Sequence, residues 1–191
     1  MKKRLPYRYG RIFWVAGAVL ASSLLATGCG ITQAPKAIYL RSRALAGGSV
    51  DVTVHIAADA NQNSPVAVDL LVVYDEGLMA KLLQMTAREW FAQRDQIRRD
   101  FKDGEGFDAW GWEWIPAQKI PVQELPLKPS ALGALVFADY DSPGTHRFRI
   151  DPFEDIVLHL NETDFVAETE KSYEKRISES QIFTDVAGDS Q

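Results

Sequence analysis

Hydrophobic and polar positions alternate most clearly in residues 49–56. Apolar residues stand at every second position, Val50, Val52, Val54 and Ile56, and between them lie Asp51, Thr53 and His55. A period of two places the apolar set on one face of a β-strand. Residues 66–74 are apolar on nearly both faces, apart from Asp69, which predicts a central strand. Because 58–65 is rich in turn formers, we expect these two strands to form an antiparallel hairpin with an eight-residue loop.

The pattern changes to helical spacing between Leu78 and Phe101, a stretch without proline or glycine. Its apolar positions lie three, four or seven residues apart and include Met79, Leu82, Leu83, Trp90 and Ile97. This spacing predicts an amphipathic helix or a pair of helices, inserted near 77–102. Thr86 followed by Glu89 matches a capping box, so a second helix is expected to begin near residue 87.

Strand patterns resume in the second half of the chain. Prolines in 118–127 indicate an edge strand, and 131–140, 145–150 and 155–160 follow as further strands. Residues 37–45 are interpreted as a short first strand. About seven strands and one helical insertion predict a mainly β protein with a β-sandwich over 49–167. Residues 168–191 form a charged C-terminal extension, either a weak helix or a solvated tail.

The first 28 residues have the pattern of a secretory signal peptide. Five basic residues and no acidic residue precede 12–27, a stretch of sixteen residues without charge. A membrane-spanning helix needs about 20 residues to cross about 30 Å of hydrocarbon. The stretch therefore fits the short apolar core of a signal peptide, and we expect residues 1–28 to be removed. A buried N-terminal helix is the alternative, but the basic residues would have no use in a soluble core.

Cys29, the one cysteine of the chain, follows directly after Ala26-Thr27-Gly28. This sequence resembles the bacterial lipobox, in which a diacylglycerol is attached to the cysteine thiol and an acyl chain such as palmitate completes the anchor. The resemblance implies a lipid-anchored chain that begins at Cys29, with 29–48 holding a tether and the short strand. Gly30 stands where aspartate favours the inner membrane, which implies the inner leaflet of the outer membrane, facing the periplasm.

The charge of the chain restricts its partners. The full sequence has 21 basic and 26 acidic residues, and removal of the signal peptide leaves 16 basic residues and a net charge of about −10. Nucleic-acid binding depends on phosphate neutralisation by lysine and arginine, so the sequence argues against nucleic-acid binding. A chain of this length can bury the core of one domain.

Residues typical of catalysis or metal binding are sparse. His55, His146 and His159 fall on three predicted strands, and none has a histidine or cysteine at metal-ligand spacing. We interpret each as a surface histidine. The sequence also lacks a Gly-x-Ser-x-Gly motif and a phosphate-binding glycine loop. We therefore expect no enzymatic activity, no metal and no cofactor beyond the covalent lipid on Cys29; a hydrolase with paired carboxylates stays open as an alternative.

Trp110, Trp112 and Trp114 alternate within 102–118, a glycine-containing segment interpreted as a loop. Alternation in an extended segment places the three indoles on one side. An exposed row of this kind would suit a module that binds carbohydrate, peptidoglycan or a partner protein. We favour the alternative that the rings cap an open end of the sandwich or pack on the helix, because exposed indoles promote aggregation.

Residues 50–75, VDVTVHIAADANQNSPVAVDLLVVYD, are similar to the start of the TssJ family. That family is the outer-membrane lipoprotein subunit of bacterial type VI secretion systems. The helix that follows, the segment IPAQKIPV and the paired strands of LGALVFADYDSPGTHRFRI agree with the family pattern in their order. The likeness covers roughly residues 20–165. Phe148 stands where the family pattern has tryptophan, and the tryptophan segment is longer, which is typical of a divergent member.

The resemblance implies a transthyretin-like β-sandwich without catalytic activity. It also implies a structural role in a secretion complex that crosses the envelope. There the lipoprotein would hold the periplasmic part of the inner-membrane protein TssM, with TssL in the same complex. In the family, the loop between the first two core strands contacts this partner, which maps the contact to Asp59, Asn61, Gln62, Asn63 and Ser64. A polar loop held between two rigid strands also suits recognition on physical grounds.

Overall fold

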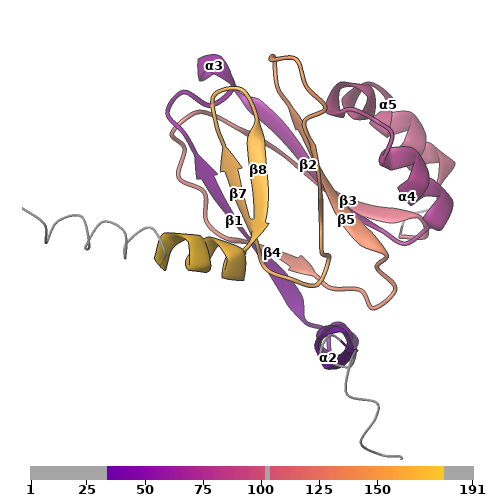
Figure 1. Cartoon of the computed structure of the whole chain (residues 1–191). Helices are drawn as coiled ribbons and strands as arrows, with labels where there is room; N and C mark the ends of the chain where they lie inside the picture. Colours follow the sequence, from indigo (N-terminus) through magenta and orange to yellow (C-terminus); the bar gives the residue numbers. More distant parts are fainter. Residues whose placement is uncertain (1–33, 102–103, 179–191) are drawn as a thin grey trace, which may run out of the picture. The chain divides into compact units, whose positions relative to one another are not determined.

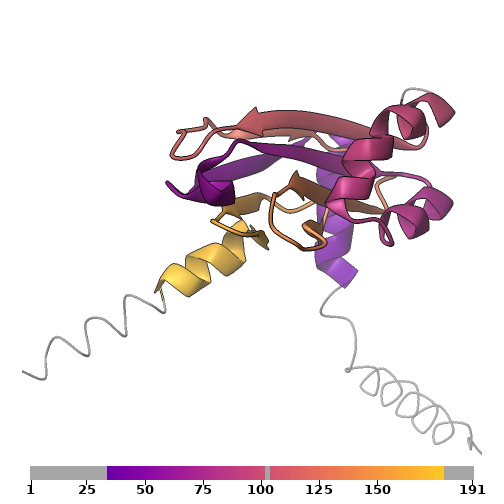
Figure 2. The ribbon, with the colours of Figure 1, turned by 90° about the horizontal axis from the view of Figure 1, so that it is seen from above.

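The protein folds as two four-stranded β-sheets packed face to face, with helices on the outside of one sheet (Figure 1, Figure 2). A computed structural model describes residues 34–101 and 104–178. The first sheet has the order β4 (Gln123–Pro126), β1 (Ser49–Ile56), β7 (Ile156–Leu160) and β8 (Phe165–Thr169). The second sheet has the order β3 (Phe107–Trp114), β2 (Val66–Val73), β5 (Gly133–Asp139) and β6 (Arg147–Ile150). The mainly β sandwich expected from the sequence is therefore confirmed.

The main core lies between the two sheets. Val50, Val52 and Val54 of β1 are buried there, as their alternation predicts. β2 runs between β3 and β5 and is buried along almost its whole length, so its position as a central strand is confirmed. Neighbouring strands pair antiparallel, except β1 and β7, which pair parallel from Val52 to Ile56.

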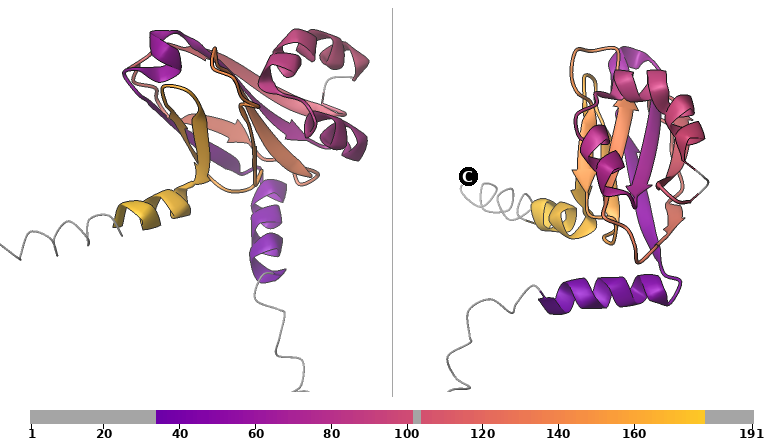
Figure 3. Two further views of the ribbon diagram at one scale, coloured as in Figure 1. Left: turned by 45° about the horizontal axis from the view of Figure 1, so that its top comes forward. Right: turned by 90° about the vertical axis from the view of Figure 1, so that its right-hand side faces the viewer.

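A second core lies between the outer face of the β3-β2-β5-β6 sheet and a pair of helices, α4 (Glu76–Leu82) and α5 (Ala87–Asp100). Figure 3 shows both helices in front of this sheet. Trp90 of α5 is fully buried and stacks on Phe137 of β5, with ring centroids 5.4 Å apart. The predicted capping box starts α5, because the Thr86 hydroxyl accepts from the Glu89 N–H and the Glu89 carboxylate accepts from the Thr86 N–H.

Residues 34–45 form a helix, α2 (Ala34–Leu45), so the short first strand predicted over 37–45 is wrong. The C-terminus of α2 has a helix C-cap. Gly47 has a left-handed φ of 76°, and the Gly48 N–H donates a hydrogen bond of 2.9 Å to the Arg43 carbonyl oxygen. A short apolar run suits a strand or a helix equally, and alternation over so few residues does not decide between them. The sandwich lies within the compact unit Leu40–Gln191.

The strand organisation differs from the prediction in three further ways. β1 and β2 do not form a hairpin, because they belong to different sheets and the loop between them crosses the sandwich. The tryptophan segment is not a loop but the eight-residue strand β3, which pairs with the whole of β2. The described residues contain eight strands where about seven were predicted, because the strand expected over 37–45 is absent and both β3 and β8 (Phe165–Thr169, beside β7) are added. Residues 170–178 continue from β8 as a helix, and Gly104–Gly106 lead into β3 after the α5 helix.

Candidate functional site

Three loops meet at one end of the sandwich, and we call them together the loop platform: residues 58–65, 140–146 and 161–164. They connect β1 to β2, β5 to β6 and β7 to β8. Figure 1 shows the first and third of them side by side at the top of the view, where α3 (Ala60–Asn63) stands beside the turn between β7 and β8. The expected recognition loop is thus one of three segments that form a common surface.

Hydrogen bonds from α3 hold the first loop on the other two. The backbone N–H groups of Asn61 and Gln62 donate 3.1 Å to the carbonyl oxygens of Asn161 and Glu162. The Asn61 carboxamide oxygen accepts from the Asp141 N–H at 2.8 Å. The Asn61 side chain is only 2% exposed, so the expectation that it reaches towards a partner is wrong. It acts instead as a bracket that joins two loops.

The backbone of α3 is left-handed at three successive residues. Asn61, Gln62 and Asn63 have φ angles of 45°, 54° and 67°. Residues other than glycine seldom adopt this region, and asparagine tolerates it better than most. The three bends leave Gln62 and Asn63 exposed at the tip, together with Asp59, whereas Ser64 is half-buried. Four of the five predicted contact residues are therefore accessible to some degree.

His146 is a second bracket within the platform. Its side chain is 6% exposed, so its interpretation as a surface histidine is wrong. Nδ1 lies 2.9 Å from Asp164 Oδ1, and Nε2 lies 2.8 Å from the Ser142 carbonyl oxygen. Both neighbours are acceptors, so a neutral imidazole donates to one of them and an imidazolium donates to both. The Ser142 hydroxyl donates to the Thr163 carbonyl oxygen, which ties the same two loops together again.

Serine, histidine and aspartate are also the residue types of a hydrolase triad, but the geometry here differs from one. A triad places the imidazole Nε2 against the serine hydroxyl. Here Nε2 faces the Ser142 backbone oxygen, while the hydroxyl oxygen lies 3.5 Å away and donates to another residue. The hydroxyl is buried and its proton is directed at the carbonyl of Thr163. This arrangement clamps two loops and does not activate a nucleophile.

The exposed side chains of the platform carry negative charge. Asp59, Asp141, Glu162 and Asp164 are all exposed, one or two from each loop. The same three segments contain no lysine or arginine. Tyr140 lies buried beneath them, and its burial and the nearby Asp164 carboxylate raise its pKa. A uniformly acidic surface attracts and orients a basic partner surface.

The three tryptophans face the interior of the sandwich, on the side of β3 that packs on the main core. Trp114 is 4% exposed, and Trp110 and Trp112 are half-buried against the same cluster. The rings of Trp112 and Trp114 stack on each other with centroids 5.3 Å apart. The rings therefore pack against the main core between the sheets and not on the helices, and a binding role for the half-buried Trp110 and Trp112 stays a prediction.

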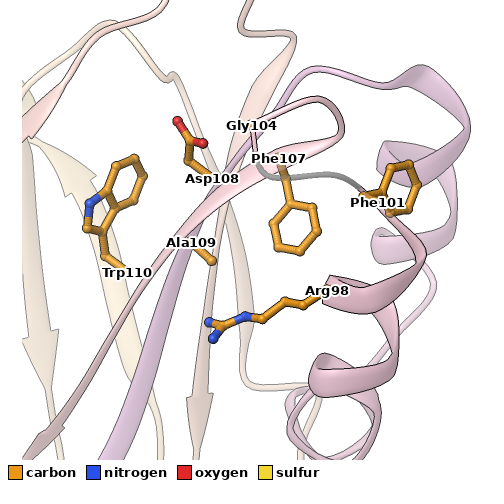
Figure 4. A pocket seen from close by; sticks show the side chains of 7 residues that line it. All are labelled: Arg98, Phe101, Gly104, Phe107, Asp108, Ala109 and Trp110. Carbon is orange, nitrogen blue, oxygen red and sulfur yellow. The ribbon is translucent and has the colours of Figure 1, made fainter.

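A hollow of about 340 Å³ lies beside β3 and the end of α5 (Figure 4). Figure 4 shows Arg98 reaching towards it from the helix, with Phe107 and Asp108 contributed by the strand. Its charged groups are already engaged. The Asp108 carboxylate is paired with Lys128 and accepts from the Tyr74 hydroxyl at 2.8 Å, and Arg98 lies 4.0 Å from Asp69. The charged groups around the hollow are therefore occupied by contacts within the protein, and the Arg98–Asp69 pair joins α5 to the sheet.

Several expectations concern residues outside the described part of the chain. The predicted signal peptide, residues 1–28, and the lipidation site, Cys29, both lie there. Within residues 34–101 and 104–178, no helix is long and apolar enough to cross a membrane. Within the same residues, no three histidine, cysteine or carboxylate side chains are grouped so as to hold a metal ion.

Comparison with known proteins rests on structure alone. No protein-family model and no curated protein sequence matches the chain. Among solved structures, the type VI secretion lipoprotein TssJ1 from Pseudomonas aeruginosa superimposes with a TM-score of 0.51 and 14% identity, over 65% of this chain and 97% of TssJ1. Lip from Serratia marcescens, a membrane-bound component of the type VI secretion system, superimposes with a TM-score of 0.50 and 10% identity, over 65% of this chain and 99% of Lip. The chain therefore has a fold similar to that of the TssJ-type lipoproteins of type VI secretion, as the resemblance in its sequence implied.

Proposed function

We propose that this protein is a lipid-anchored structural subunit of a type VI secretion membrane complex. Cys29 carries the diacylglycerol and acyl anchor in the inner leaflet of the outer membrane, and the sandwich stands in the periplasm. There it binds the periplasmic part of a TssM-like inner-membrane protein, in a complex that also contains TssL. The shared fold, the lipobox-like sequence before Cys29 and the construction of the loop platform support this proposal.

The loop platform is the observation on which the proposal mainly rests. A recognition surface needs exposed polar groups held on a stiff support, because ordering flexible loops on binding costs free energy. Here Gln62 and Asn63 are exposed at a tip whose backbone is fixed to a neighbouring loop by two hydrogen bonds of 3.1 Å. The brackets at Asn61 and His146 stiffen the same surface from below. The acidic residues around the tip favour a basic patch on the partner.

The partner contact is tested with a small change at the tip. Gln62→Ala combined with Asn63→Gly removes both exposed carboxamides, and the glycine at position 63 adopts the left-handed backbone without strain. The matched control is Gln93→Ala, the same change at an exposed position on α5. We expect the tip variant to capture the purified periplasmic domain of the TssM-like partner at least tenfold more weakly in a binding titration. The melting temperature should stay unchanged in both variants. Equal binding by the tip variant and the control would contradict the proposed contact.

The anchor is tested separately. Cys29→Ser removes the thiol that would carry the lipid and leaves the sandwich untouched. We expect the natural chain to fractionate with outer membranes and to incorporate labelled palmitate, and the variant to lose both properties. Membrane association that survives Cys29→Ser would contradict a lipid anchor at this residue.

A further inference from the structure

A cluster of three rings joins the helix at 170–178 to the outer face of the β4-β1-β7-β8 sheet. His55 on β1 and His159 on β7 are register partners across the parallel pair. Their imidazoles stack with centroids 5.1 Å apart and planes 17° from parallel. Tyr173 of the helix lies against both, with centroid distances of 5.7 Å to His55 and 5.3 Å to His159. We call these three rings the histidine clasp.

The charged groups around the clasp come from three other parts of the chain. Glu168 on β8 places Oε1 3.0 Å from His159 Nε2, although Nε2 is not aligned for a hydrogen bond. Arg176 pairs with Glu168, and its guanidinium carbon lies 5.4 Å from the centre of the Tyr173 ring. Lys119 lines an open hollow of about 650 Å³ beside the histidines. The clasp thus faces one carboxylate that is already paired with Arg176, and Lys119 stands on the wall of the adjoining hollow.

Tyr173 in the clasp and the Arg176–Glu168 ion pair both join this helix to the sheet. Tyr173 is the half-buried residue of 170–178, and the other residues of the segment are exposed. The start of the helix is fixed by the Glu170 N–H, which donates 3.0 Å to the Asp155 carbonyl oxygen. A helix of this length is marginal by itself in water, so its position depends on these tertiary contacts.

We propose that the histidine clasp is an acid-sensitive latch, which holds the 170–178 helix on the sheet near neutral pH and releases it in mild acid. A neutral His159 imidazole stacks on the His55 ring without charge repulsion. Protonation of His159 places a positive charge in a half-buried site, with its ring stacked 5.1 Å from that of His55 and Arg176 nearby, and Glu168 is already engaged with Arg176. Release separates Tyr173 from the pair and exposes the half-buried His159 imidazole to water, which stabilises its charge.

The direction of the effect follows from proton linkage. Burial and the neighbouring His55 hold the pKa of His159 below its usual value, against an opposing effect of Glu168. The closed clasp therefore binds fewer protons than the open one. Its stability is fully present above the usual histidine pKa of about 6.5 and declines as the pH falls below that value. Each unit of pKa difference between the two states changes their ratio about tenfold.

Hydrogen exchange on the full chain tests the latch. Exchange of the amides in 170–178 is followed at pH 7.5 and pH 5.0, with times scaled for the intrinsic pH dependence of exchange. We expect protection of this segment to fall about tenfold at pH 5.0, while β5 (Gly133–Asp139) stays protected because it is buried in the middle of its sheet. Equal protection of 170–178 at both pH values would overturn the proposal, and so would a parallel loss in β5, which would indicate global unfolding.

Two variants distinguish release of the latch from a general loss of fold stability in acid. Combined His55→Gln and His159→Gln substitutions keep polar side chains on the sheet but remove the titration, so protection of 170–178 should no longer depend on pH. Tyr173→Ala removes the contact, so the segment should exchange rapidly at both pH values. If protection of 170–178 still falls tenfold at pH 5.0 in the double histidine variant, the pH dependence does not come from these two histidines and the proposal is contradicted. Protection of β5 in each variant reports whether the sandwich is folded.

Discussion

The indole N–H of Trp90 donates a 2.9 Å hydrogen bond to the carboxylate of Asp69, and both side chains are buried. Asp69 is 1% exposed in the middle of β2, and Arg94 reaches the same carboxylate at 3.1 Å. An aspartate in an otherwise apolar strand thus fixes where α5 lies on the sheet. The polar residue that interrupts the β2 pattern is a docking point for the helix.

Replacement of Asp69 should therefore destabilise the fold strongly. Asp69→Ala leaves the Trp90 N–H without its partner and Arg94 without its counter-charge, and we expect a loss of about 3–5 kcal/mol in the free energy of unfolding. Asp69→Asn keeps an acceptor for the indole and should lose less. Urea denaturation measures both. Asp95→Ala, at an exposed position on α5, serves as the control and should change stability little.

Gly111 is required where β3 passes Asp69. The two residues are register partners, and a Cβ atom on Gly111 would lie 2.6 Å from Asp69 Oδ1. We expect Gly111→Ala to cost about 1–3 kcal/mol, as overpacking in a core does. The double variant Asp69→Ala/Gly111→Ala should lose less than the sum of the single losses, because the clash needs both side chains. Strict additivity in urea denaturation would show that the two sites are independent.

Asn61 should be important for the shape of the platform rather than for direct contact. Asn61→Ala removes the bonds to the Asp141 N–H at 2.8 Å and to the Pro65 carbonyl oxygen at 2.9 Å. It also places alanine in a left-handed conformation. We expect a loss of about 1–3 kcal/mol and faster hydrogen exchange across 58–65. Gln62→Ala should leave both quantities unchanged, and a similar loss in that variant would contradict the distinction between bracket and tip.

The capping box of α5 should give the fold an acid-sensitive component. Hydrogen bonds from the Thr86 N–H and hydroxyl lower the pKa of Glu89. Because the pKa of Glu89 is lower in the folded state, its ionised carboxylate stabilises the fold at pH values above the pKa of an unfolded glutamate. This stabilisation is lost as the pH falls through the pKa of the folded state. Glu89→Gln should remove this component from the pH profile of unfolding. Thr86→Ala should cost about 1 kcal/mol at pH 7, the usual effect of losing an N-cap.

Much of the local structure could be predicted from the sequence. The alternation in Val50, Val52 and Val54 identified β1 and its buried face, and the continuous apolar run identified β2 as central. The capping box placed the start of α5 correctly. These features depend on side chains close together in the chain, and a period of two or 3.6 residues expresses them directly.

The candidate site was predictable only in part. The turn-rich composition of 58–65 identified a bent polar loop, but Asn61 turned out to point inwards. No pattern in the sequence predicted the cluster of Ser142, His146 and Asp164, because these residues lie on two loops that only the fold brings together. Similarly, stacking of His55 on His159 depends on the parallel pairing of β1 and β7, which are 104 residues apart at this register.

The sequence by itself determined the extended or helical state of segments with a clear period, such as β1, β2 and α5, the apolar face of β1, and where a lipid anchor is expected; it did not determine α2, β3 or β8. Only the tertiary structure decided which strands are neighbours. β1 and β2 lie in different sheets because an eight-residue loop is long enough to cross the roughly 10 Å between packed sheets. An alternating pattern records which side of a strand is buried and carries no information about the strand beside it. Pairing, and with it the loop platform and the histidine clasp, is therefore fixed by contacts between segments distant in the sequence.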